Sequence, residues 1–285
     1  PNVVVADYVM VPLDILRFHE KIKLSADIMT IDTMIFLITT SANIQFTAVE
    51  CLANKTAYTL EKTLDKVVRL YKLRGFIVEV CLADLEFNCV RDHLMSIGVI
   101  LKMCGPNEHV PNVERKIRTV KERVRSVLMV LPFQQFPSTI VIHAVFFSVM
   151  WLNFFPPKGG VSSTLSPQAI IVGTVPDFKK HCRAPFGSYA QVNTEPSPSN
   201  DVMTSRTVGG IALGPTGNLQ GTYKFLSMLT GCVIQARSFT PLPMPSDVIK
   251  AVEEMTTKNL DLTSLLPMHT DMEEDLDYVP EDQDS

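Results

Sequence analysis

Two carboxylates lie where apolar segments of this sequence could bring them together to do chemistry. Asp27 lies inside an apolar segment that reads as a strand, and Asp84 directly follows another such segment. A carboxylate embedded in apolar strand sequence is costly unless it is paired or binds a cation. A turn or edge carboxylate would also explain each residue alone, so both interpretations remain open at this point.

A third carboxylate, Glu114, begins a polar stripe on a predicted helix. Residues at spacing i, i+4, i+7 and i+11 share one helix face, and here they are Glu114, Arg118, Lys121 and Arg125. Residues 114–125 hold six basic and two acidic side chains, and Arg115 and Lys116 flank the stripe. The pattern predicts either a solvated face with internal ion pairs or a carboxylate at the head of a helix that binds phosphates.

The elements that must position these residues read as a mixed sheet with helices on its faces. Segments dense in β-branched and aromatic residues predict strands at 24–31, 34–40, 44–51, 76–82 and 99–103. Apolar residues at helical spacing predict helices over 60–71, 90–97 and about 111–130. Three sequential strands followed by helix, strand, helix and strand predict an α/β fold with a mixed sheet.

The second half of the chain changes in character. Residues 138–155 are almost wholly apolar, but His143, Asn153 and the flanking prolines favour a buried helix over a membrane span. Residues 183–241 lack helical periodicity and predict a small all-β module. Residues 271–285 contain eight acidic and no basic side chains, which predicts a disordered acidic tail.

The charge balance excludes a strongly basic protein, but residues 1–270 taken alone carry a net positive charge. The net charge is −4, and leaving out the eight acidic residues of the tail gives +4 for residues 1–270. Six cysteines form no CxxC pair and lie in apolar surroundings, so we expect reduced, buried thiols in an intracellular protein. No export or transit peptide is visible.

A series of motifs resembles the integrase of copia-type LTR retrotransposons, above all the divergent forms of algae and protists. The resemblance covers roughly residues 20–250, and its most specific part is the Glu114 segment. Its motifs are Asp27-Ile28-Met29, Ala83-Asp84-Leu85-Glu86-Phe87, residues 108–123, residues 151–157, Lys179-Lys180-His181-Cys182-Arg183, residues 209–218 and Leu242-Pro243-Met244-Pro245.

The resemblance implies an RNase H-like mixed β-sheet flanked by helices, with a small C-terminal all-β module. It implies Asp27, Asp84 and Glu114 as catalytic residues that bind Mg²⁺ or Mn²⁺, since hard cations prefer oxygen ligands. The implied reaction is processing of DNA 3′ ends followed by strand transfer into target DNA. Partners would be DNA and further copies of this chain, without a membrane, and an active protein would be nuclear. Residues implied to contact DNA are Arg115, Lys116, Arg118, Lys121 and Arg125.

Two departures from the family pattern bear on activity. Leu85 stands after the second Asp, where family members commonly have Gly, and would strain the turn if that position needs positive φ. Asp32-Thr33 replaces an Asn-Gly-like turn after the first strand. Alternatives are therefore a catalytically decayed integrase-like protein that binds nucleic acid and a stand-alone nuclease of the same fold.

The expected organisation divides the chain into five parts. We expect an N-terminal extension (1–23), a catalytic core (24–155), a connecting segment (156–182), a small β module (183–245), and a short helix followed by the acidic tail (246–285).

Overall fold

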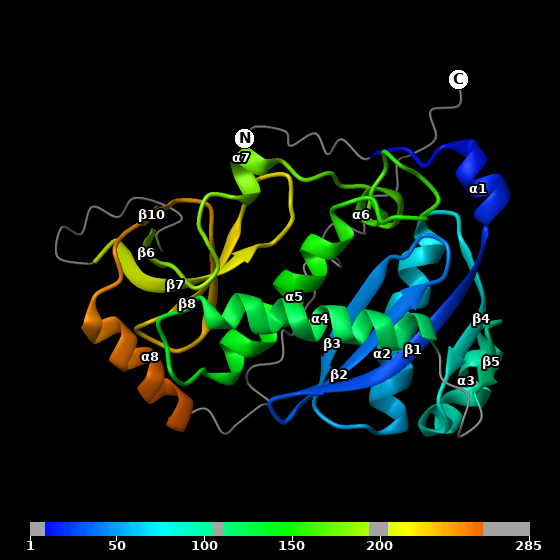
Figure 1. Cartoon of the computed structure of the whole chain (residues 1–285), viewed down its shortest axis with the longest axis horizontal. Coiled ribbons are helices and arrows are strands. Elements are labelled where there is room, and N and C mark those ends of the chain that lie inside the picture. The colour runs from blue at the N-terminus through cyan, green and yellow to red at the C-terminus, as the bar shows by residue number, and fades with distance from the viewer. Residues whose placement is uncertain (1–8, 105–110, 194–204, 259–285) are drawn as a thin grey trace.

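The computed structural model describes residues 9–104, 111–193 and 205–258, and all structural statements below concern these ranges. The acidic tail, His109 and the excursion at 195–200 lie outside them. The described residues form two β-sheets with helices packed on and between them (Figure 1).

The first sheet contains every strand that the sequence pattern predicts for the first half of the chain. Its spatial order is β3-β2-β1-β4-β5. Strands β1, β2 and β3 pair antiparallel, whereas β1–β4 and β4–β5 pair parallel. The strands are β1 (Lys21–Ile31), β2 (Met34–Ser41), β3 (Thr47–Leu52), β4 (Ile77–Ala83) and β5 (Ile100–Met103). The predicted mixed sheet of an α/β fold is confirmed.

Two strands begin three residues away from their predicted starts. Strand β1 begins at Lys21 rather than at residue 24, and α1 (Leu13–His19) precedes it. Strand β3 begins at Thr47 rather than at residue 44. Ile44 lies in the turn after β2 and is buried there, so its apolar side chain led to the prediction of a strand residue. Gln45 in this turn has a φ of 60°, which ends the extended conformation.

Helices cover both faces of the first sheet. Helix α2 (Ala57–Leu73) packs its apolar stripe on one face, where Leu60 and Leu64 join Leu24 of β1 in one hydrophobic cluster. Helices α4 (Pro111–Met129) and α5 (Ser138–Asn153) cover the other face. They share a hydrophobic cluster with Met29 of β1 and Phe36 of β2. The short helices are η1 (Leu85–Val90), α3 (Arg91–Ser96), α6 (Pro167–Ile171) and α7 (Phe178–His181).

Helix α5 is the predicted buried helix, and it lies between the two sheets (Figure 1). Because sheets and α4 surround it, nearly all its sides are apolar, which explains a hydrophobic run without helical period. Asn153 ties it to β3, accepting from the Thr47 N–H (3.0 Å) and donating to the Thr47 carbonyl (2.7 Å). Within the described ranges, no helix is long and apolar enough to cross a membrane.

The predicted small all-β module is an antiparallel sheet in the order β10-β6-β7-β8-β9. Its strands are β6 (Tyr189–Asn193), β7 (Thr207–Pro215), β8 (Tyr223–Ser227), β9 (Val233–Ala236) and β10 (Phe239–Pro241). The sheet has a core of its own around Tyr223 and Phe225, but Ile211 and Leu213 join the cluster of α4 and α5. Helix α8 (Ser246–Lys258) also packs there through Val252.

The six cysteines are free thiols, but the prediction that they are buried is wrong for half of them. Cys89, Cys182 and Cys232 are exposed: Cys89 lies in the short helix η1, and the other two lie in connections between elements. Cys51 and Cys104 are partly buried. Only Cys81, in the centre of β4, is fully buried, and burial raises the pKa of its thiol to about 12.

Candidate carboxylate site and basic helix

The strand order places Asp27 and Asp84 next to each other. Strands β1 and β4 are neighbours and parallel, and their last paired residues are Ser25 and Leu82. Asp27 and Asp84 each lie two residues beyond this pair, so their side chains project from the same face of the sheet and at the same level along the strands. That face is the one covered by α4, because Met29, two residues beyond Asp27, packs in the α4 cluster.

The carboxyl group of Asp27 is half-buried and lies within the field of three other carboxylates. Burial is the main reason that its pKa is raised, and the negative charges of Asp84, Glu114 and Glu86 raise it further. The backbone N–H of Ile28 donates to Asp27 Oδ1 at 2.7 Å and acts in the opposite direction. Asp84 and Glu114 therefore lie near enough to Asp27 for their charges to act on it.

The three carboxylates are not drawn together around one point. Among the described residues, no group of three or more His, Cys, Asp or Glu side chains lies close enough to hold a metal ion. Asp84 and Glu114 are exposed, so their carboxyl groups can change rotamer without unpacking the core. The donor set suits Mg²⁺ or Mn²⁺, since it consists of carboxylate oxygens whose mutual repulsion a cation would relieve.

Asp84 is held by the segment that follows it. It caps η1 with extended backbone (φ −74°), its carbonyl accepts from the Phe87 N–H (3.0 Å), and Phe87 is buried. Leu85 is not among the described residues with positive φ, so the strain that its position was expected to cause is not found in this turn. Glu86 faces solvent and pairs with Lys55 at 3.2 Å.

The five predicted DNA-contacting residues are spread around the sides of α4 that do not face the sheet. Val113, Val120 and Val124 are buried against the sheet and mark the inner side of the helix. At 100° per residue, Arg118, Lys121 and Arg125 lie on the flank of Glu114, Lys116 lies on the opposite flank, and Arg115 lies on the outer side between them. The basic side chains therefore extend from the Glu114 flank of α4 across its outer side to Lys116.

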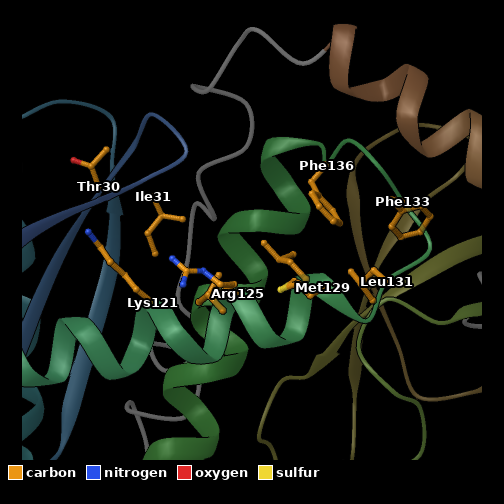
Figure 2. A pocket seen from close by; sticks show the side chains of 10 residues that line it. Thr30, Ile31, Lys121, Arg125, Met129, Leu131, Phe133 and Phe136 are labelled. Atoms are coloured by element: carbon orange, nitrogen blue, oxygen red, sulfur yellow. The ribbon is translucent and has the colours of Figure 1, made fainter.

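A groove of about 490 Å³ runs beside the Glu114 flank. Figure 2 shows Lys121 and Arg125 reaching from α4 towards Thr30 and Ile31 at the end of β1. Its other wall is apolar and comes from the segment after α4, where Phe133 and Phe136 meet edge to face with ring centroids 6.3 Å apart. The groove thus combines two cations with aromatic surface.

The remaining motif residues have structural roles. His181 is buried; its Nδ1 accepts from the Asp177 N–H (3.1 Å), and its Nε2 donates to the Asn218 carbonyl (2.9 Å). It therefore ties α7 to the connection between β7 and β8. Asp32 lies exposed in the β1–β2 turn, as predicted for a turn carboxylate.

The first sheet defines an RNase H-like fold. In this fold five strands form a mixed sheet in the order β3-β2-β1-β4-β5, as they do here. The chain is similar in structure to the catalytic core domain of BIV integrase, with a TM-score of 0.39 and 16% sequence identity over 53% of this chain and 93% of that one. The assignment of the fold rests on strand order and pairing. No protein-family model matches the sequence. No curated protein matches it either.

Proposed function

We propose that this protein is a metal-dependent integrase that processes DNA 3′ ends and joins them to target DNA. The observation that supports the proposal best is the electrostatic coupling of Asp27 to Asp84 and Glu114. These carboxylates come from two adjacent parallel strands and a basic helix.

Asp27, Asp84 and Glu114 would hold Mg²⁺ or Mn²⁺ in the active protein. Bound divalent cations supply activation of the attacking oxygen and stabilisation of the leaving oxygen in phosphoryl transfer. The chain itself would contribute positioning, with Arg118, Lys121 and Arg125 placing DNA phosphates beside the carboxylates. Joining two DNA ends requires more than one such site, which favours a homo-oligomer. A protein that joins these ends to target DNA would act in the nucleus.

A strand-transfer assay with labelled DNA ends and Mg²⁺ or Mn²⁺ tests this proposal. Asp84→Asn keeps the size of the side chain but removes the charge, and we expect it to lower product formation about 100-fold or more. Glu86→Gln is the matched control, since Glu86 also acts on Asp27 but pairs with Lys55. It should retain most of the activity. Equal activity of wild type and Asp84→Asn contradicts the proposal.

A catalytically decayed protein that binds nucleic acid is the second candidate. The separation of the three carboxylates favours it, because no group able to hold a metal exists among the described residues. For such a protein, neither wild type nor Asp84→Asn gives product in the strand-transfer assay. Both bind DNA with equal strength in a binding measurement on the same DNA.

A further inference from the structure

The groove beside the Glu114 flank of α4 presents charge and apolar surface to one ligand. Lys121 and Arg125 supply two positive charges on its α4 wall, and neither forms an ion pair within the described ranges. Phe133 and Phe136 supply an apolar wall (Figure 2). At about 490 Å³, the groove falls within the range of about 300–1,000 Å³ that is typical of ligand-binding pockets.

The apolar wall of this groove continues onto exposed surface. Met129 lines the groove and is 78% exposed, and the neighbouring Val130 is 81% exposed. An unbranched Met side chain adapts to partners of different shape. A nucleic-acid backbone would neutralise the cations, but its phosphates offer no apolar surface to Met129 or Phe136. The groove therefore suits a peptide segment that is acidic and apolar at once.

A segment with this composition occurs in the same chain. Residues 271–279, which we call the tail segment, hold five acidic and no basic side chains. Between the acidic residues lie Met272, Leu276, Tyr278 and Val279. The tail segment lies outside the described part of the chain. Its charge is complementary to the two cations of the groove, and its apolar side chains match the aromatic wall.

Helix α8 connects the groove to the tail segment. The Gln134 N–H donates to Glu253 Oε1 of α8 at 2.7 Å. Gln134 lies between Phe133 and Phe136, the two aromatic residues of the groove. Val252 of α8 is buried in the same hydrophobic cluster as Phe133. The helix that precedes the tail segment is therefore attached to the wall of the groove.

The tail segment is long enough in its connection to reach the groove. Helix α8 ends at Lys258, which is about 7.5 Å along the helix axis from Glu253. The chain from Lys258 to Asp271 can span up to about 40 Å. The tail segment can therefore enter the groove while α8 stays packed.

We propose that the tail segment docks in this groove of its own chain. Its acidic side chains contact Lys121 and Arg125, and its apolar side chains pack against Phe133 and Phe136. A segment tethered by a short linker acts at an effective concentration of about millimolar, so contacts of modest strength suffice. The docking does not rest on the proposed function, but it covers two cations that this function assigns to DNA. The tail segment and DNA therefore compete for them.

NMR of the full chain tests the docking through the methyl signals of Leu128 and Met129, which line the groove. The segment variant neutralises three acidic residues of the tail segment, Glu274→Gln/Asp275→Asn/Asp277→Asn. The control variant neutralises one Glu and two Asp residues beyond it, Glu281→Gln/Asp282→Asn/Asp284→Asn. We expect the segment variant to shift both methyl signals and the control variant to leave them as in wild type. Equal spectra of wild type and the segment variant overturn the proposal, as does an equal shift in both variants.

Two further variants test the two walls of the groove separately. Lys121→Gln/Arg125→Gln removes the partners of the acidic side chains and should shift the amide signals of the tail segment. Leu276→Ser/Tyr278→Ser removes apolar side chains and should shift the Met129 methyl signal in the same direction as the segment variant does. If either variant leaves these signals unchanged, the corresponding wall takes no part and the proposed docking is overturned.

Dilution distinguishes the tail segment of the same chain from that of a second copy. Docking within one chain does not depend on protein concentration, so the Met129 methyl signal of wild type should keep its position on dilution. A signal that moves on dilution towards its position in the segment variant would assign the groove to a second copy and overturn the proposal.

DNA affinity gives a second readout in the full chain. The segment variant should bind DNA about fivefold more tightly than the control variant, because two surface ion pairs of ordinary strength no longer hold the tail segment. Both variants have the same net charge, so general repulsion between the tail and DNA does not explain a difference. Equal affinities would overturn the competition with DNA. The methyl spectra need no DNA, so failure of the proposed function leaves the test of docking intact.

Discussion

Asp27 and Asp84 each stand two residues beyond Ser25 and Leu82, the last paired residues of adjacent parallel strands, and the charge of Asp84 raises the pKa of Asp27. Two carboxylates in this relationship repel each other when both are ionised, which lowers the stability of the fold. A site that keeps such an arrangement is typical of cation binding and catalysis.

The first prediction concerns the order in which neighbouring charges act on Asp27. Removing the charge of Asp84 should lower the pKa of Asp27 most, removing that of Glu114 less, and removing that of Glu86 least. None should restore the ordinary value of 3.8, because burial is the largest cause of the shift. NMR titration of the side-chain carboxyl carbon in Asp84→Asn, Glu114→Gln and Glu86→Gln measures this. An Asp27 pKa that is unchanged in Asp84→Asn would refute the proposed proximity.

The second prediction is that Asp27→Asn stabilises the protein at neutral pH. The folded state raises the pKa of Asp27, so the free energy of unfolding falls as pH rises from the ordinary value of 3.8 through the raised one. The Asn side chain removes this loss and still accepts from the Ile28 N–H. The gain should be about 1.4 kcal/mol for each unit of the shift and should shrink as pH falls towards 3.8.

Urea unfolding at several pH values measures that gain. Glu122→Gln makes the same kind of change at an exposed position on α4 and should alter stability by less than about 0.5 kcal/mol. Destabilisation by Asp27→Asn at pH 7 would show that the folded state favours the ionised carboxylate after all.

The third prediction concerns the hairpin between β1 and β2. Asp32 and Thr33 have φ of 46° and 67°, as a two-residue type I′ turn requires, but a β-branched residue is strained there. Thr33→Gly should therefore stabilise the protein by about 1 kcal/mol. Thr30→Gly, the same exchange within β1, should destabilise it. Chemical denaturation compares the two variants, and equal effects would mean that the turn is not strained.

The fourth prediction concerns the groove beside the Glu114 flank. If Arg125 contacts a DNA phosphate, Arg125→Gln should lower the salt slope of DNA binding by about 1. Arg69→Gln, on exposed α2 surface, should leave it unchanged. Binding curves at several salt concentrations measure both slopes, and equal slopes for Arg125→Gln and wild type would remove Arg125 from the DNA-binding surface.

How far the sequence determines this structure depends on the kind of element. Strands β1 to β5 follow from hydrophobic patterns, and the order of strands and helices predicts a mixed sheet. The burial of Ile44 in a turn could not be read from the sequence, because a buried turn residue and a strand residue have the same composition. Nor could the pattern show that Ile211 of the second sheet packs on α5, since packing between distant segments leaves no local period.

The sequence alone proposes the residues of the candidate site, and their catalytic and DNA-contacting roles stay predictions. Helical spacing alone groups Glu114 with Arg118, Lys121 and Arg125. The fold also brings Thr40 and Lys158 from other elements to line one pocket with Arg115 and Lys116, which no local pattern could show. The Lys55–Glu86 pair is equally invisible in the sequence, because 31 positions separate its members.

The most direct test of the central claim is a crystal structure of the full chain soaked with Mn²⁺, with data collected to reveal the anomalous scattering of manganese. Our account predicts an anomalous peak bound by oxygens of Asp27, Asp84 and Glu114, and no such peak in Asp84→Asn crystals. A wild-type crystal saturated with Mn²⁺ that shows no peak between these side chains, or a peak that persists unchanged in Asp84→Asn, would contradict it.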